Sequence, residues 1–194
     1  MAEILTERLM LRPFRAADLA AFAAYRSHPD IARYQSWDSP YSMADTESFL
    51  DSQRGLTFGQ PGAWLQLAMI DRETAALHGD CAVRVLVDQP ATAELGVTLA
   101  PASQAKGLAT EALTAVVKEL FEEHDMHRVF AETDDRNVAV HRLFERLGFR
   151  REARLIEADW FKGEWSTLRV YALLNREWRE HQSAPSKGRS QSRH

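Results

Sequence analysis

The segment of this sequence best suited to binding a ligand is a run of small residues, 100–109, between a predicted strand and a predicted helix. A chain that turns from a strand directly into a helix leaves several backbone N–H groups unpaired, and the helix dipole there favours an anion. Gly107 and Ala109 lack the bulk that would keep a phosphate away. Lys106 adds a positive charge and Thr110 a hydroxyl. The spacing predicts a diphosphate-binding turn, although an ordinary capped turn would have the same spacing.

The elements around this turn follow from hydrophobic periodicity. Alternating apolar residues predict strands, and apolar residues three and four apart predict amphipathic helices. The predicted strands are residues 9–13, 64–70, 77–87, 91–99, 128–133, 149–160 and 168–174, and the predicted helices are 18–27, one that begins near 42, 109–121 and 140–147. This order requires a mixed sheet, with antiparallel strands early and parallel crossovers around the last two helices. The predicted fold class is therefore α/β or α+β with a central mixed sheet.

Composition limits the partners and the location of the protein. The chain has 194 residues, of which 45% are apolar and 27% charged, which suits one compact domain. We expect this domain over residues 1–180 and a disordered basic tail over 181–194, where Lys187, Arg189 and Arg193 have no acidic neighbour. The formal charge is −4, so a nucleic acid is not an expected partner.

No apolar run approaches the roughly 20 residues that span a bilayer, and the first residues do not resemble a signal peptide. We therefore expect a cytoplasmic protein without a membrane partner. Cys81 is the only cysteine and is expected to be a buried strand thiol. His124 and His127 are expected to compensate a helix dipole, and no metal site is predicted. Neither a Walker loop nor a G-x-G-x-x-G run is present, so nucleotide hydrolysis and hydride transfer lose their main support.

Four motifs in order give a resemblance to a known family. Gln104-x-x-Gly107-x-Ala109 resembles the acetyl-coenzyme A signature of the GNAT superfamily of N-acetyltransferases, and residues 137–149 resemble that superfamily's second cofactor motif. Residues 5–13, and residues 162–165 together with Val170-Tyr171, are similar to the RimJ/RimL-type branch, whose named members acetylate protein N-termini. The resemblance covers about residues 5 to 178.

The resemblance implies a GNAT fold with a mostly antiparallel, seven-stranded central sheet that is splayed between its fourth and fifth strands and flanked by helices. It also implies acetyl-CoA as the co-substrate. The pantetheine arm would pair with main chain at Val97 and Leu99, next to Thr98, and Asn137 would bond the pantetheine or order the adjoining helix. A plain helix N-cap is an equally good role for Asn137. The diphosphate would be held by the N–H groups of Gln104, Ala105, Lys106, Gly107, Leu108, Ala109 and Thr110.

The reaction needs a base for the amine and an acid for the leaving thiolate, and the sequence offers two candidates for the base. Glu132 lies where some family members place their catalytic glutamate, and Glu94 could also face the acceptor cleft, although either could be an ordinary strand glutamate. Many family members have a tyrosine, able to protonate the leaving thiolate, at the position of Phe144, whose ring has no proton to donate. Phe144 could equally be a core residue or line the cofactor site.

The expected acceptor is an amine, either a protein N-terminus or a small molecule, enclosed by Tyr34, Trp37 and Trp160. Core packing is an alternative role for both tryptophans. The family makes a homodimer possible. A CoA-binding regulatory module with degenerate catalysis is the alternative function, because Phe144 replaces the acid and the base is uncertain.

Overall fold

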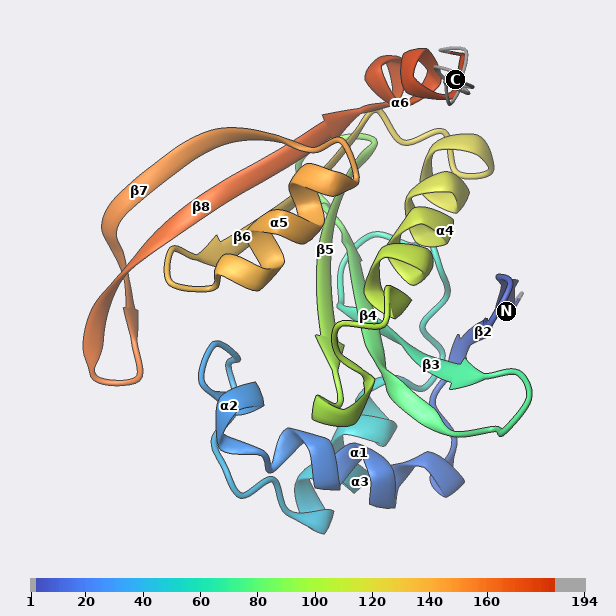
Figure 1. Cartoon of the computed structure of the whole chain (residues 1–194), viewed down its shortest axis with the longest axis vertical. Coiled ribbons are helices and arrows are strands. Elements are labelled where there is room, and N and C mark those ends of the chain that lie inside the picture. The colour runs from blue at the N-terminus through green and yellow to red at the C-terminus, as the bar shows by residue number, and fades with distance from the viewer. Residues whose placement is uncertain (1–2, 184–194) are drawn as a thin grey trace, which may run out of the picture.

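The computed structural model describes residues 3–183 and shows one twisted, mixed sheet with helices on both faces (Figure 1). The strand order is β1-β2-β3-β4-β5-β6-β8-β7, and every neighbouring pair is antiparallel except β5 and β6. The strands are β1 (Ile4–Leu5), β2 (Leu9–Pro13), β3 (Leu65–Asp71), β4 (Leu77–Val85), β5 (Thr92–Leu99), β6 (Arg128–Asp134), β7 (Arg150–Phe161) and β8 (Glu164–Leu174).

Helices connect and cover the strands. They are the short η1 (Ala16–Asp18) and η2 (Pro101–Ser103), α1 (Leu19–Arg26), α2 (Pro29–Ala32), α3 (Met43–Ser52), α4 (Leu108–Glu122), α5 (Val138–Arg146) and α6 (Asn175–Ser183). Ser42 caps α3 by accepting a hydrogen bond from the Asp45 amide at 3.1 Å, while the Asp45 carboxylate accepts one from the Ser42 amide. None of the helices within residues 3–183 has the length and apolar content to cross a bilayer.

The alternation of side chains along the central strands builds a core on each face of the sheet. In β3, Leu67 and Met69 join the cluster that packs under α4, whereas Ala68 and Ile70 face the opposite cluster, which α1, α2 and α3 cover. Cys81 is fully buried in the first cluster, as the sequence predicts. Helix α4 therefore rests on a fixed apolar surface, and its N-terminus is held at the end of β5.

The sheet divides where β5 and β6 meet. These strands pair only from Thr92↔Arg128 to Glu94↔Phe130, after which β6 continues to pair with β8 as far as Asp134. The predicted splay between these two strands is thus confirmed. It leaves one edge of residues 95–99 without a neighbouring strand.

The sequence predicts seven strands where the structure has eight. The additional strand, β1, has two residues and pairs with Met10 and Leu11, and so short a segment carries no period-two pattern. The four-residue α2 and the polar α6 were also not predicted. Helix α6 extends through Ser183, so residues 181–183 belong to a helix and not to the predicted tail. The rest of that tail, residues 184–194, lies outside the described residues.

The docking of α4 can be tested at Leu113, a fully buried side chain in the middle of this helix. Leu113→Ala should lower the free energy of unfolding by about 2–5 kcal/mol, because it removes apolar contacts and leaves a cavity. Thr114→Ala, on the exposed face of the same helix, should change it by less than about 0.5 kcal/mol. Urea denaturation followed by circular dichroism measures both, and equal values for the two variants would contradict this packing.

Candidate active site

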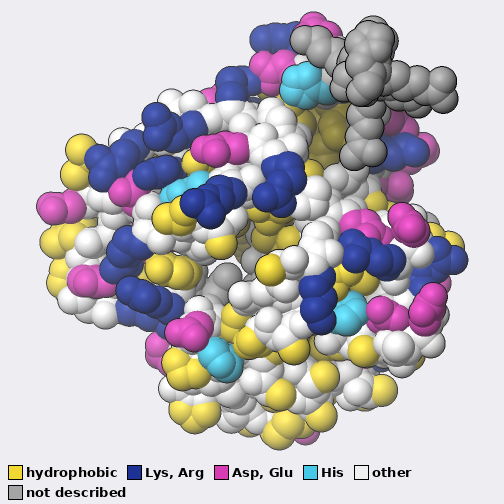
Figure 2. All heavy atoms as spheres, viewed as in Figure 1, with side chains coloured by type: hydrophobic (Ala, Val, Ile, Leu, Met, Phe, Trp, Pro, Cys, Tyr) yellow, Lys and Arg dark blue, Asp and Glu magenta, His cyan; other side chains and the backbone are white. Residues whose placement is uncertain are grey.

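A groove of about 580 Å³ runs between β5, the start of α4 and α5. In Figure 2 the surface is hollowed between these elements and α2. Most of the predicted cofactor residues line the groove: Val97, Thr98, Leu99, Gln104, Ala105, Gly107, Ala109, Thr110 and Asn137. Lys106 is exposed beside it, whereas Leu108 is buried in the core beneath α4. The structure therefore brings together residues from three separate segments of the chain.

The loop from η2 into α4, residues 103–110, is termed the amide turn below. Ala105 and Gly107 both adopt left-handed backbone conformations, with φ of 58° and 79°. Among the described residues, the N–H groups from Ala105 to Thr110 donate no backbone hydrogen bond, and the first helical bond comes from the Glu111 amide to the Gly107 carbonyl at 3.0 Å. The Gln104 amide, which was also predicted to hold the diphosphate, is not free, because it donates to the Pro101 carbonyl at 3.2 Å in the η2 turn. Consecutive free amides at a helix N-terminus form a concave anion site, so the turn fits a diphosphate.

The backbone of β5 supplies a second set of free groups. The Ala100 amide donates to the His78 carbonyl of β4, and the Thr92 carbonyl accepts from the Leu86 amide. The backbone N–H and C=O groups of the even-numbered residues of β5 therefore point toward β4. Because the hydrogen-bonding direction alternates along a strand, the main chain of Val97 and Leu99 faces the gap toward β6. The Gln104 side chain donates to the Leu99 carbonyl at 3.3 Å, which leaves Val97 as the pairing position inside the groove.

Positive charge lies along one side of the groove. Arg142 and Arg146 project from α5 and line it, and the Arg146 guanidinium lies 3.4 Å from the Thr110 hydroxyl. Figure 2 shows Lys and Arg side chains on this side of the hollow. These arginines were not among the predicted site residues, although their i, i+4 spacing in the second motif places them on one face of a helix.

A smaller cavity of about 180 Å³ continues the groove toward the β7–β8 hairpin. Tyr34, Val97 and Asn137 line both cavities, so they mark the junction. Glu132 and Asp159 line the small cavity, and neither carboxylate forms an ion pair or hydrogen bond with any described residue. The continuous space is therefore positive at the amide-turn end and negative at the hairpin end.

The two candidate bases have different surroundings. Glu132 is exposed on β6 and faces the small cavity. Glu94 is buried against Arg84 on β4 and lines neither cavity. Burial raises the pKa of the Glu94 carboxyl; Arg84 opposes this effect and the charge of Glu132 adds to it. Of the two candidate bases, only Glu132 therefore has access to the cavity.

Phe144 is 1% exposed and packs against Phe149 and Tyr171, with ring centroids 5.1 and 6.0 Å away. Phe144 also lines the small cavity, so it is a core residue that forms part of the wall. The Asn137 side chain caps α5 by accepting from the Val140 amide at 3.3 Å and lines the groove as well. Both of the roles considered for Asn137 are thus compatible with its position.

The aromatic residues expected around the acceptor are only partly in place. Tyr34 lines both cavities. Trp37 lines neither, because its ring stacks on the Arg26 guanidinium, whose central carbon lies 3.7 Å from the ring centroid. Trp160 is 60% exposed on the hairpin, where it packs edge-on against Trp165. The prediction that these two tryptophans enclose the acceptor is therefore not supported, because a spacing pattern does not show on which side of a hairpin or loop a ring lies.

The tip of the β7–β8 hairpin closes the small cavity. The Lys162 ammonium donates to the carbonyls of Ala32 and Trp37 at 2.8 and 2.6 Å, and so connects the hairpin to the segment that follows α1.

No group of three or more His, Cys, Asp or Glu residues within residues 3–183 is arranged to hold a metal ion.

Comparison with known proteins agrees with this geometry. Residues 8–150 match the family model described as the acetyltransferase (GNAT) domain, so the chain belongs to the GNAT acetyltransferases. The chain is a GNAT N-acetyltransferase, a family that uses acetyl-CoA.

Curated relatives include the uncharacterized N-acetyltransferases YnaD of Bacillus subtilis, 27% identical over 90% of this chain and 98% of its own, and p20 of Bacillus licheniformis, 24% identical over 92% and 99%.

Solved structures show the same fold. A GNAT-family acetyltransferase from Bacillus anthracis has a TM-score of 0.81 and 27% identity, covering 90% of this chain and 99% of its own. A proposed ribosomal-protein-serine acetyltransferase from Vibrio cholerae has a TM-score of 0.75 and 24% identity over 89% and 97%. Spermidine N-acetyltransferase from Vibrio cholerae, solved with CoA and spermine, has a TM-score of 0.74 and 20% identity over 88% and 98%.

The amide turn can be tested at Gly107. Gly107→Glu would place bulk and negative charge among the free amides, so the rise in melting temperature that CoA produces should disappear. Gly163 at the hairpin tip is a matched control, because its φ of 86° is similarly left-handed and a side chain there meets open space. Gly163→Glu should keep the shift in a thermal-denaturation assay. Equal rises in melting temperature with CoA for both variants would show that the amide turn does not bind the cofactor.

Proposed function

We propose that this enzyme binds acetyl-CoA in the groove, with its diphosphate on the amide turn, and transfers the acetyl group directly to a primary amine in the small cavity. The observation that carries the proposal is the set of free amides from Ala105 to Thr110 beside an unpaired edge of β5. The acceptor is a protein N-terminal α-amine, as in the RimJ/RimL-type branch, or a small-molecule amine.

The main chain of β5 would orient the thioester. The pantetheine arm carries amides, which can pair with the free main chain at Val97 as an added strand does. The amide of Val97 faces the gap and that of Thr98 faces β4, so the Val97 amide would donate to the oxyanion that forms on the thioester. A donor of this kind contributes about 3 kcal/mol in comparable sites.

Glu132 is the proposed base, because its carboxylate lines the cavity and has no cationic partner among the described residues. The cost of deprotonation depends on the acceptor. At pH 7 an α-amine of pKa about 7.8 costs roughly 1 kcal/mol, and a lysine-like amine of pKa about 10.4 costs about 4.6 kcal/mol. No hydroxyl is available at Phe144, so water would protonate the leaving thiolate, whose thiol has a pKa of about 8.5.

The charge of the small cavity narrows the acceptor class. Neighbouring acids such as Asp134 are neutralised by arginine, with Arg136 2.6 Å away, whereas Glu132 and Asp159 are not. Two unpaired carboxylates favour an acceptor with a second positive charge besides the reacting amine. The Vibrio cholerae spermidine N-acetyltransferase acts on a molecule of this kind.

The function is tested by thiol release from acetyl-CoA with a panel of N-terminal peptides, monoamines and polyamines. Turnover with at least one amine is expected. CoA binding without turnover on any amine would instead support the regulatory module that the loss of the acid at Phe144 suggests.

Glu132→Gln should lower kcat by about 10²-fold and change the dissociation constant of CoA by less than twofold, because the amide cannot accept the proton. Steady-state kinetics and calorimetry measure the two quantities. A larger loss of kcat in Glu94→Gln would transfer the role of base to Glu94, and unchanged kcat in both variants would assign it to water.

Asp159→Asn should raise the KM of spermidine about tenfold and leave that of a monoamine within twofold, because only the polyamine places a second ammonium near this carboxylate. Glu157→Gln is the control, since Glu157 is exposed on the same strand and lines neither cavity. Equal KM values for spermidine in all three proteins would show that Asp159 does not select the acceptor.

A further inference from the structure

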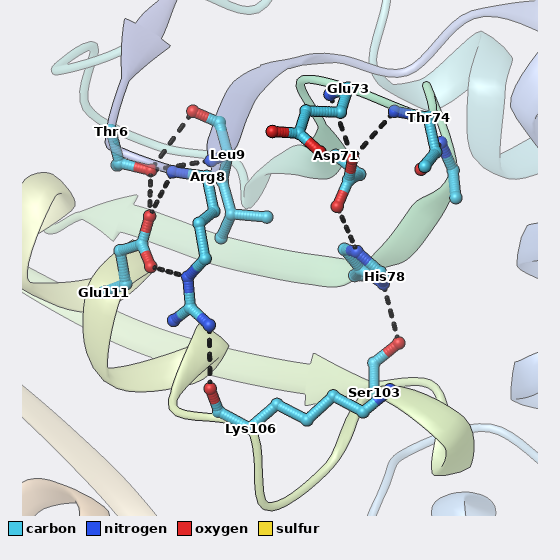
Figure 3. Close-up of polar contacts among 11 residues, drawn as sticks. Thr6, Arg8, Leu9, Asp71, Glu73, Thr74, His78, Ser103, Lys106 and Glu111 are labelled. Carbon is cyan, nitrogen blue, oxygen red and sulfur yellow. Dashed lines mark hydrogen bonds and ion pairs between the residues drawn. The ribbon is translucent and has the colours of Figure 1, made fainter.

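The amide turn has few bonds of its own. Its free N–H groups and its two left-handed residues leave the first part of the loop without a helical or strand ladder. A site made of backbone amides binds tightly only if the amides already point to one place before the ligand arrives. Two groups of side chains reach this loop, one at its first residue, Ser103, and one at Lys106 in its middle (Figure 3).

The first group is a relay of Asp71, His78 and Ser103 (Figure 3). Asp71 is fixed at the β3–β4 turn, where its Oδ1 accepts from the amides of Thr74 and Glu73 at 2.8 and 3.0 Å. Its Oδ2 lies 3.1 Å from His78 Nε2, and His78 Nδ1 lies 2.8 Å from the Ser103 hydroxyl.

A direction for each bond follows from chemistry. An ionised carboxylate only accepts, so Nε2 of His78 carries the proton and Nδ1 accepts from the Ser103 hydroxyl. The hydrogen bonds from Thr74 and His78 hold the pKa of Asp71 well below its usual range, so it stays ionised at neutral pH. The relay thus connects the rigid β3–β4 hairpin to the residue that precedes Gln104.

The order Asp–His–Ser also occurs in hydrolases, but the surroundings differ here. Ser103 is 5% exposed and lines neither cavity, so its hydroxyl is not presented to a substrate. Its amide also donates to the Ala100 carbonyl at 2.8 Å, which closes the η2 turn. Ser103 is therefore placed to hold a loop.

The second group is a clamp of Thr6, Arg8 and Glu111 (Figure 3). Glu111 Oε1 accepts from the Thr6 hydroxyl and the Arg8 amide at 2.6 and 2.8 Å, and Oε2 accepts from Arg8 Nε at 2.7 Å. With its Nε fixed, Arg8 donates through Nη1 to the Lys106 carbonyl at 3.0 Å. Its Nη2 lies 3.5 Å from the point where a Cβ of Gly107 would be. The clamp thus fixes the turn at Lys106 and places a guanidinium beside the free amides.

We propose that the relay and Arg8 are positioning residues, which hold the amide turn in the shape that binds the diphosphate of CoA and so set the affinity for this part of the cofactor. The inference rests on the proposed function, in which the turn binds that diphosphate. The acetyl-transfer step occurs at the other end of the groove, so these residues should govern cofactor affinity and leave the chemistry unchanged.

The test uses the full chain and its variants Arg8→Met, His78→Ala, Ser103→Ala and the double variant of His78 and Ser103. Calorimetry gives the dissociation constants of CoA and of dephospho-CoA, which keeps the diphosphate but lacks the 3′-phosphate. Each single change should raise both constants about tenfold. The double variant should lose no more than either of its single variants, because both remove the same hydrogen bond.

Two further variants separate positioning from general stability. His124→Ala, a partly exposed histidine packed on Phe58 away from the turn, should lower the melting temperature and leave both dissociation constants within twofold. His78→Asn, whose amide oxygen takes the place of Nδ1, should recover part of the affinity that His78→Ala loses.

Unchanged dissociation constants in the relay and Arg8 variants would overturn the proposal, as would an equal loss of affinity in His124→Ala. A loss confined to CoA and absent with dephospho-CoA would also overturn it, because the effect would then lie at the 3′-phosphate. If the unaltered protein bound neither CoA nor dephospho-CoA, the result would instead contradict the proposed function, in which the groove binds acetyl-CoA.

Discussion

The early end of pairing between β5 and β6 is the constraint on which the rest of the site depends. A strand inside a sheet normally has both of its edges satisfied, and buried backbone groups without partners are costly. Here β8 holds β6 along its full length, so β6 cannot turn back to follow β5 beyond Glu94. The main chain at Val97 is left with bonding capacity directed into a groove, and a ligand with its own amides can satisfy it.

A second consequence of the splay is electrostatic. The groove reaches from the arginines of α5 at one end to Glu132 and Asp159 at the other, in a chain whose formal charge is only −4. Within a cleft these local fields matter more than the net charge, because its walls exclude water and reduce screening. In the proposed function, an anionic cofactor and a cationic acceptor would each be attracted to a different end, and their reacting groups would meet at the junction lined by Tyr34, Val97 and Asn137.

The sequence predicted the parts of this architecture that depend on local periodicity or on short motifs. The seven longer strands, helices α1, α3, α4 and α5, and the splay were predicted correctly. The predicted cofactor residues, apart from Lys106, Leu108 and Phe144, line the groove. The elements β1 and α2 were not predicted, because two or four residues carry no measurable period, and α6 was not, because Trp178 is its one apolar residue. Long-range partners were also missed: Arg8 lies 98 residues from Lys106, and His78 lies 25 residues from Ser103. The prediction that Trp37 and Trp160 enclose the acceptor is not supported for the same reason, since a residue type alone does not say which cavity a side chain faces.

The absence of an acid at Phe144 and the presence of two free carboxylates favour the same kind of acceptor. Without a proton donor the thiolate must leave unprotonated, which its thiol pKa of about 8.5 allows, and the cost of neutralising the amine is the part that depends on the acceptor. In a diamine the charge of one ammonium lowers the pKa of the other, so the reacting amine loses its proton at a smaller cost. Both carboxylates line the small cavity, so in the proposed function Asp159 would hold the distant ammonium while Glu132 would take the proton from the near one. A second positive charge on the acceptor would then serve both recognition and chemistry.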